Sequence, residues 1–217
     1  MRRIKLNKHV LPITLIVSTI IFWLVFYGKL PGEMPIHWNV SGEVDGYAPK
    51  LFTMFMSIGI MIFVYLLLVF IPRIDPKKEN YKYFSKGYSI IHLSSLLLFF
   101  VINLLVILSG LGYKVNVGLV IPIIIGASFI VIGNYMPQTK PNYFVGIKTP
   151  WALNDENNWK RTQRFGGKAF IIGGLMFMIL PFLSDSFEEF IGLPVVLVIL
   201  LSPILYSYLL FRNRSKA

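Results

Sequence analysis

The sequence lacks cysteine and has few charged residues. None of the 217 residues is cysteine, which excludes disulfide bonds, thiol nucleophiles and cysteine-based zinc sites. Only 14% of the residues are charged, compared with about 25% in a typical soluble domain. Because 55% are hydrophobic, the chain has no room for a separate water-soluble domain.

Six apolar stretches contain most of the hydrophobic residues. They cover 10–27, 51–71, 88–110, 117–132, 169–183 and 191–211. A transmembrane helix needs about 20 apolar residues, so the short fourth and fifth stretches are expected to extend into their flanks. The sequence therefore predicts an all-α, polytopic integral membrane protein with six transmembrane helices.

Lysine and arginine are unevenly distributed between the gaps that separate these stretches. Eighteen of the 21 lie in the two termini and in every second gap, including Arg2, Arg3, Lys5 and Lys216. The alternate gaps hold the other three, together with six of the ten carboxylates. Basic residues favour the cytoplasmic side, so both termini are predicted to be cytoplasmic. This bias accounts for the net charge of +11 without direct nucleic-acid binding, and membrane lipids become expected partners.

Glycines in the fourth and fifth stretches share a spacing of seven residues. Gly126 and Gly133 lie on one helix face, and so do Gly167 and Gly174. Small residues let membrane helices approach closely, which predicts that these two helices pack together. The alternative is that glycine is simply common in membrane helices. In the third stretch, Asn103 is expected to form an interhelical hydrogen bond.

The first outer loop, residues 28–50, is rich in proline and glycine and is expected to be compact rather than helical. We interpret it as a recognition surface formed by His37, Trp38, Asn39, Glu43, Asp45 and Tyr47. One alternative is an interfacial lid with its aromatic side chains at headgroup level. A metal site built from His37, Glu43 and Asp45 has too few strong ligands, so no metal is predicted.

The inner loop, residues 133–168, is far longer than a connection between two helices requires. Its first half, to Trp151, is expected to be irregular, and its second half to begin a helix capped by Asn154. We interpret the loop as a docking surface for a cytoplasmic partner, or as a plug folded against the helices. The candidate docking residues are Asn134, Lys148, Thr149, Pro150, Trp151, Trp159, Arg161 and Arg164. The alternative for its basic residues is that they only anchor the helix ends.

Both loops resemble a known family of bacterial membrane proteins. Residues 34–47, MPIHWNVSGEVDGY, resemble a short motif that precedes the SdpI domain. The run from Gly146 to Trp151, with Gly133, Asn134 and Trp159 around it, resembles the SdpI core motif.

The resemblance implies an immunity protein that protects the cell against a secreted peptide toxin. It also implies a signalling role, in which a cytoplasmic transcriptional repressor is held at the membrane. It divides the chain into a two-span region, 1–86, and an SdpI-like four-span region, 87–217, within one structural domain.

Catalytic motifs are absent from the sequence. There is no HExxH, GxSxG or phosphate-binding loop, and His9, His37 and His92 lie in different segments. The chain is therefore expected to be neither an enzyme nor a cofactor-binding protein. His92 is open to two interpretations, a pH sensor or simple burial near the membrane interface. The alternative functions are a transporter or permease component for a small molecule or peptide, and a membrane-embedded peptidase.

Overall fold

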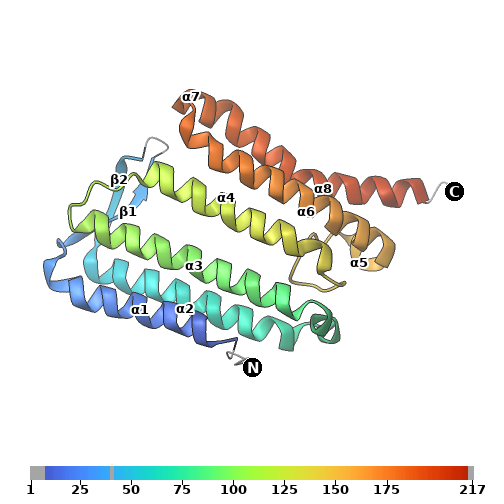
Figure 1. The fold of residues 1–217 in the computed structure, drawn as a ribbon, viewed down its shortest axis with the longest axis horizontal. Coiled ribbons are helices and arrows are strands. Elements are labelled where there is room, and N and C mark those ends of the chain that lie inside the picture. Colours follow the sequence, from blue (N-terminus) through green and yellow to red (C-terminus); the bar gives the residue numbers. More distant parts are fainter. Residues whose placement is uncertain (1–7, 40–41, 215–217) are drawn as a thin grey trace, which may run out of the picture. The chain divides into compact units, whose positions relative to one another are not determined.

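The computed structural model describes residues 8–39 and 42–214. Four residues of the predicted basic tails, Arg2, Arg3, Lys5 and Lys216, lie outside these residues, and so do Val40 and Ser41 of the outer loop. The six long helices are α1 (Val10–Phe26), α2 (Lys50–Ile74), α3 (Ser85–Gly110), α4 (Val117–Tyr135), α6 (Glu156–Ile179) and α8 (Leu193–Arg214) (Figure 1).

Within residues 8–39 and 42–214, six helical segments are long and apolar enough to cross a membrane. At most 33% of the most apolar window of each segment is buried inside the protein. Such exposure of apolar side chains is unfavourable in water and expected in lipid. The predicted number of transmembrane helices is therefore confirmed.

The chain forms two compact units. The first contains α1, α2 to Leu68, α3 from His92, and a β-hairpin made of β1 (Glu33–Trp38) and β2 (Val44–Pro49). The strands pair antiparallel, with a register shift around His37. The description "all-α" did not anticipate this hairpin, although the loop is compact and non-helical as expected.

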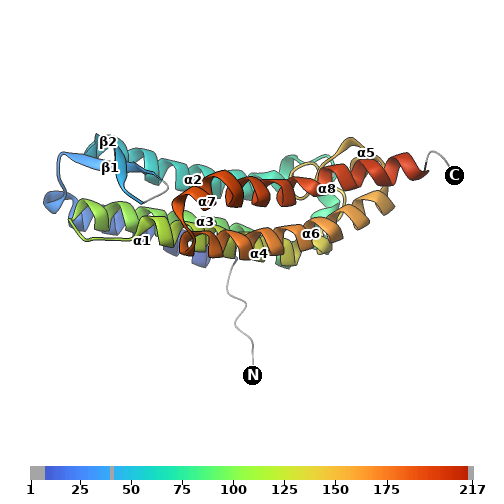
Figure 2. The ribbon, with the colours of Figure 1, turned by 90° about the horizontal axis from the view of Figure 1, so that it is seen from above.

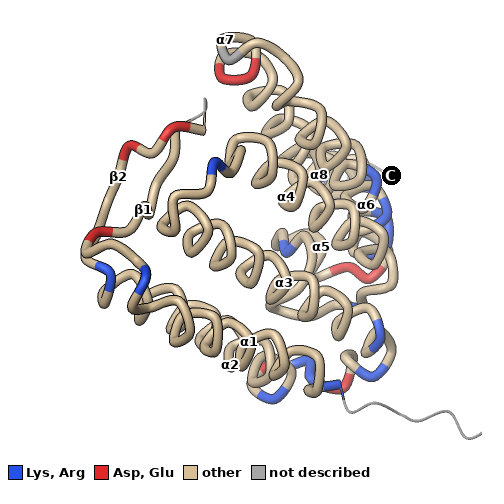
Figure 3. The backbone as a smooth tube through the Cα atoms, turned by 60° about the vertical axis from the view of Figure 1, so that its left-hand side comes forward, with Lys and Arg blue, Asp and Glu red and all other residues tan. Residues whose placement is uncertain are grey.

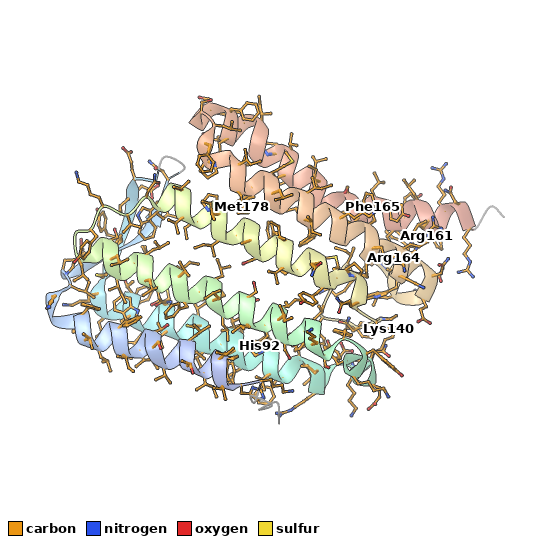
Figure 4. All side chains as sticks on the ribbon, viewed as in Figure 1. His92, Lys140, Arg161, Arg164, Phe165 and Met178 are labelled. Carbon is orange, nitrogen blue, oxygen red and sulfur yellow. The ribbon has the colours of Figure 1, made fainter. Side chains whose placement is uncertain are left out.

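Trp23 lies at the centre of the first unit. Its side chain is completely buried, and its indole Nε1 donates a hydrogen bond of 2.8 Å to Oδ1 of Asn103. This contact confirms the predicted interhelical hydrogen bond. His92 is also buried, with its ring 5.4 Å from that of Tyr65, and its Nε2 has no hydrogen-bond partner among the described residues (Figure 4). Simple burial and pH sensing both remain open interpretations for His92.

The second unit contains the end of α2, the start of α3, α4 from Leu119, and the elements that follow α4. Here α4 and α6 meet through glycine. A Cβ at Gly126 would lie 2.5 Å from the carbonyl oxygen of Gly174, and one at Gly133 would lie 2.6 Å from that of Gly167. Backbone therefore packs directly on backbone at both levels, which confirms the predicted packing of these helices. Met178 of α6, labelled in Figure 4, packs at the same interface, because it also lies against Gly126.

The helices α6 and α8 run antiparallel and side by side (Figures 1 and 2). They are joined through a short helix, α7 (Asp185–Phe187), and a π-helical turn, Glu188–Gly192. In Figure 3, lysine and arginine gather where α6 begins and α8 ends, whereas Glu188 and Glu189 lie at the opposite ends of these helices.

The helix caps differ from the predicted one. Asp155, not Asn154, caps α6, because its carboxylate accepts a hydrogen bond from the backbone N–H of Asn157. Asn154 instead ends a separate short helix, α5 (Pro150–Asn154), which Thr149 caps. Asparagine and aspartate are equally good caps, so the sequence alone did not distinguish the two neighbours.

Candidate functional site

The candidate site is the segment between α4 and α6, residues 136–155, which is called the long loop below. It contains a 3₁₀ turn, Met136–Gln138, and the short helix α5, and is otherwise irregular, as predicted. A loop of this length holds many backbone polar groups, and buried ones need hydrogen-bond partners. The conformation of the long loop is therefore determined by the side chains that supply these hydrogen-bond partners.

Asn142 organises the middle of the long loop from inside. Its side chain is fully buried. Oδ1 accepts hydrogen bonds from the backbone N–H groups of Phe144, at 2.9 Å, and Val145, at 2.6 Å. Nδ2 donates to the carbonyl oxygens of Lys140 and Val145, each at 2.9 Å. One amide thus satisfies the backbone of a whole turn.

The connector between α2 and α3, residues 75–84, holds the loop from one side. Asp75 is only 2% exposed, and it accepts hydrogen bonds from the backbone N–H of Lys77, the hydroxyl of Tyr81 and the backbone N–H of Tyr143. Among the described residues this carboxylate has no ion-pair partner. Three donors therefore stabilise a buried carboxylate without a cation.

The Asp75 carboxylate also affects the neighbouring phenol. Burial, followed by the hydrogen bond to Asp75 and the charge of that carboxylate, raises the pKa of Tyr81 well above its usual value. Tyr81 therefore remains a neutral hydrogen-bond donor at physiological pH.

Two further connector side chains reach the long loop. Asn80 Nδ2 donates to the carbonyl oxygen of Pro141 at 2.7 Å, and Lys77 Nζ donates to that of Leu153 at 3.2 Å. Together with Asp75 and Tyr81, these residues form what we call the connector clamp.

The start of α6 holds the loop from a second side. Trp159 is 1% exposed, and its Nε1 donates to the carbonyl oxygen of Thr139 at 3.0 Å. Gln163 is fully buried and bonds both the N–H and the carbonyl of Ile147, at 3.0 and 2.9 Å. Gly146 has a φ of +104°, and a Cβ there would lie 2.6 Å from Oε1 of Gln163, so only glycine fits.

A buried polar network joins the loop to α8. The hydroxyls of Thr149 and Ser207 are 2.5 Å apart, and Ser207 donates to Oδ1 of Asn158 at 2.8 Å. Thr162 donates to the same Oδ1 at 2.9 Å. The ring of Trp151 packs on Tyr208, with centroids 5.1 Å apart. The long loop is therefore a folded part of this unit.

The predicted docking residues fall into two groups. Thr149 and Trp159 are buried and support the loop from within, and Trp151 is half-buried. The exposed members are Asn134, Lys148, Pro150, Arg161 and Arg164. Their role in docking remains a prediction.

Sequence reasoning missed Asp75, Tyr81, Asn142, Gln163 and Ser207. Asp75 offered some signal, because it is a lone carboxylate next to Pro76 at the end of an apolar run. Ser207 offered none, because it lies within an apolar stretch.

The β-hairpin carries the other predicted residues. His37 Nδ1 lies 2.5 Å from Oδ1 of Asp45. The Glu43 carboxylate instead accepts a hydrogen bond of 3.3 Å from Nδ2 of Asn39, whose Oδ1 accepts from the Glu43 backbone N–H at 2.9 Å. Glu43 is thus bound elsewhere, and the described residues contain no cluster of three potential metal ligands. Tyr47 is 60% exposed and Trp38 is half-buried. Recognition by this surface remains a prediction.

Comparison with known proteins gives matches to both halves of the chain. The SdpI/YfhL protein family matches residues 138–207, which include most of the long loop, the first two-thirds of α8 and all of α6. The resemblance to the SdpI family is confirmed. A domain of unknown function, DUF1648, matches residues 14–62, which include the hairpin.

One curated relative matches both the SdpI-like region and the N-terminal region of this chain. Immunity protein SdpI of Bacillus subtilis (strain 168) is 28% identical over 203 residues, which cover 94% of this chain and 95% of that protein. No solved structure matches the chain. The predicted multi-pass localisation in the cell membrane is supported by this relative and by the six apolar helices. The predicted division between residues 86 and 87 remains a prediction, since neither family match reaches it.

Proposed function

We propose that the chain is a membrane immunity protein that protects its cell against a secreted antimicrobial peptide toxin. The observation that carries this proposal is the match to an immunity protein over 94% of the chain. The SdpI family match also falls on the long loop, the most elaborately hydrogen-bonded polar segment of the second unit.

The proposed orientation places both termini and the long loop in the cytoplasm and the hairpin outside. The distribution of basic residues supports it, because Lys140, Lys148, Lys160 and the arginines of α6 all lie in or beside the long loop. Glu33, Glu43 and Asp45 belong to the hairpin, where acidic residues outnumber basic ones.

We propose that the hairpin contacts the toxin. Tyr47 and Ile36 are 60% and 38% exposed, and His37, Glu43 and Asp45 are exposed beside them. An exposed aromatic ring and an exposed isoleucine side chain, flanked by carboxylates, suit a peptide with apolar and cationic side chains. The paired strands hold these groups in fixed positions, which reduces the entropy lost on binding.

On the other side, we propose that the long loop docks a cytoplasmic transcriptional repressor. Lys148 and Pro150 are exposed next to the half-buried Trp151, and the buried network of Thr149 fixes this turn. A signal from the hairpin to this turn requires two states of the protein with different affinities for both ligands.

Protection by binding, rather than by transport or cleavage, makes a distinct prediction. A sensitive bacterium that expresses the chain should survive the toxin, and the peptide recovered from the culture should be intact and bound to membranes. Expression of the chain with Tyr47→Ser and Trp38→Ala should lower survival at unchanged protein level. Unchanged killing would contradict the immunity role, cleaved toxin would indicate a peptidase, and toxin exported from preloaded cells would indicate a transporter.

A further inference from the structure

A groove lies between the start of α6 and the end of α8. Its lining includes Asn157 and Arg161 of α6, Leu210, Asn213 and Arg214 of α8, and Asp155, and it encloses about 430 Å³. Two residues of this lining also belong to features described above, because Asp155 is the last residue of the long loop and Asn158 belongs to the buried network.

The charges in the groove favour an anion. Arg214 donates a hydrogen bond to the carboxylate of Asp155, so these two charges largely offset each other. Burial raises the pKa of Asp155, but the Arg214 guanidinium and the backbone N–H of Asn157 outweigh it and leave the pKa below its usual value. Arg161 is exposed and has no ion-pair partner among the described residues.

The donor groups around Arg161 suit the oxygens of a phosphate. The guanidinium offers a planar fork of N–H donors, and the amides of Asn157 and Asn213 line the same groove. Guanidinium–phosphate pairs are charge-assisted and often bidentate, which makes them strong.

Beyond the groove, the same face of α6 carries exposed apolar side chains, with the exposed cation of Lys168 among them. Phe165 lies one turn from Arg161 on the same face of α6, is 37% exposed, and stacks on Tyr206 of α8 with ring centroids 4.5 Å apart (Figure 4). Two turns further along α6, Ile172 is 51% exposed. A polar anion site that leads onto exposed apolar surface has the amphipathic pattern of a phospholipid. The binding of a free anion would not require an apolar surface next to the site.

We propose that this groove binds an anionic phospholipid, with its phosphate at Arg161 and its acyl chains along Phe165 and Ile172. The inference requires only that α6 and α8 span the membrane, so it stands or falls independently of the immunity role. It assigns Arg161 to lipid instead of to the docking of a protein partner.

Native mass spectrometry of the full-length protein tests this proposal. The delipidated protein is mixed with equal amounts of phosphatidylglycerol and phosphatidylcholine that carry the same acyl chains. We expect the wild type to retain phosphatidylglycerol preferentially, and Arg161→Gln to reduce that preference by about tenfold, the effect of one lost charged hydrogen bond. Lys160→Gln is the matched control, because it removes an exposed neighbouring charge that does not line the groove.

Several results would overturn the proposal. Unchanged lipid preference in Arg161→Gln would do so, and so would an equal loss in Lys160→Gln, which would indicate diffuse attraction. Displacement of the lipid by inorganic phosphate would indicate a simple anion site. Lost recruitment of a protein partner with unchanged lipid retention would assign Arg161 to docking. A thermal melt of each variant checks that the protein is folded.

Discussion

A buried carboxylate joins segments that lie far apart in the sequence. Asp75 bonds Lys77 and Tyr81 within the connector, and Tyr143 in the long loop. Because all its donors are neutral groups, its contribution depends on geometry more than on ion pairing. On the α6 side, the positive φ of Gly146 lets Gln163 approach the loop backbone closely. Single residues thus hold the long loop in place from both sides.

We expect Asp75→Asn to loosen the long loop. The amide has the shape of the carboxylate, but its NH₂ group must face donors: the Lys77 N–H if it takes the place of Oδ1, or the Tyr81 hydroxyl and the Tyr143 N–H if it takes the place of Oδ2. An unsatisfied buried polar group costs about 1–3 kcal/mol, so thermal stability should fall and hydrogen exchange at 140–147 should accelerate. Glu79→Gln is the control, since Glu79 is an exposed carboxylate of the same connector that pairs with Lys82 at 3.7 Å. Equal exchange in the two variants would contradict a special role for Asp75.

At the scale of the helices, adjacent glycines of α6 let two different faces of this helix pack closely against its neighbours. Gly167 and Gly174 lie against α4, whereas Gly173 lies against Leu200 of α8. Gly166 lies closest to Met136 and Ile147 of the long loop and, at 3.6 Å, also meets Pro203 of α8. The glycine doublets therefore allow close approach on both faces of α6. Such packing replaces the hydrophobic driving force that is absent between helices in lipid.

Gly174→Leu should sharply reduce accumulation of the protein in membranes. A Cβ at Gly174 would already lie 2.6 Å from the carbonyl oxygen of Gly126, so a larger side chain must separate α4 from α6. Gly59→Leu in α2 is the control, because a Cβ at Gly59 meets nothing within 4 Å. Gly192 is unsuitable as a control, since a Cβ there would collide with Leu180. Equal membrane levels of the two variants, measured by immunoblot, would count against close packing.

At the scale of the whole molecule, the orientation in the membrane remains to be measured. The chain has no cysteine, so a single introduced cysteine reports its own side. Cysteine at Tyr47 should react with an impermeant thiol reagent in intact cells, and cysteine at Lys148 should react only after permeabilisation. Both positions are exposed, whereas Gly42 is avoided because its φ is +77°. Labelling of the Lys148 variant in intact cells would reverse the proposed topology.

The helices could be predicted because hydrophobic runs and glycine spacing are local patterns. The close packing of α4 on α6 and the interhelical hydrogen bond of Asn103 are confirmed, whereas the partner of Asn103, Trp23, could not be named from the sequence. The strands were missed because the hairpin is short and interrupted by glycine and proline. The connector clamp was missed because Asp75 and Tyr143 are far apart in the sequence, and no local sequence pattern indicates that they are in contact.

The glycines of α6 also bear on the order in which the protein is assembled. Among the six spans, the one that contains α6 has the lowest mean hydropathy, 1.7. A weakly apolar helix gains less from lipid contact, so its place in the bilayer relies on neighbours. During synthesis α4 emerges before α6 and α8 after it, and each meets a different glycine face. We therefore expect α4 to act as the first support for the nascent α6, and the arrival of α8 to complete its retention in the membrane.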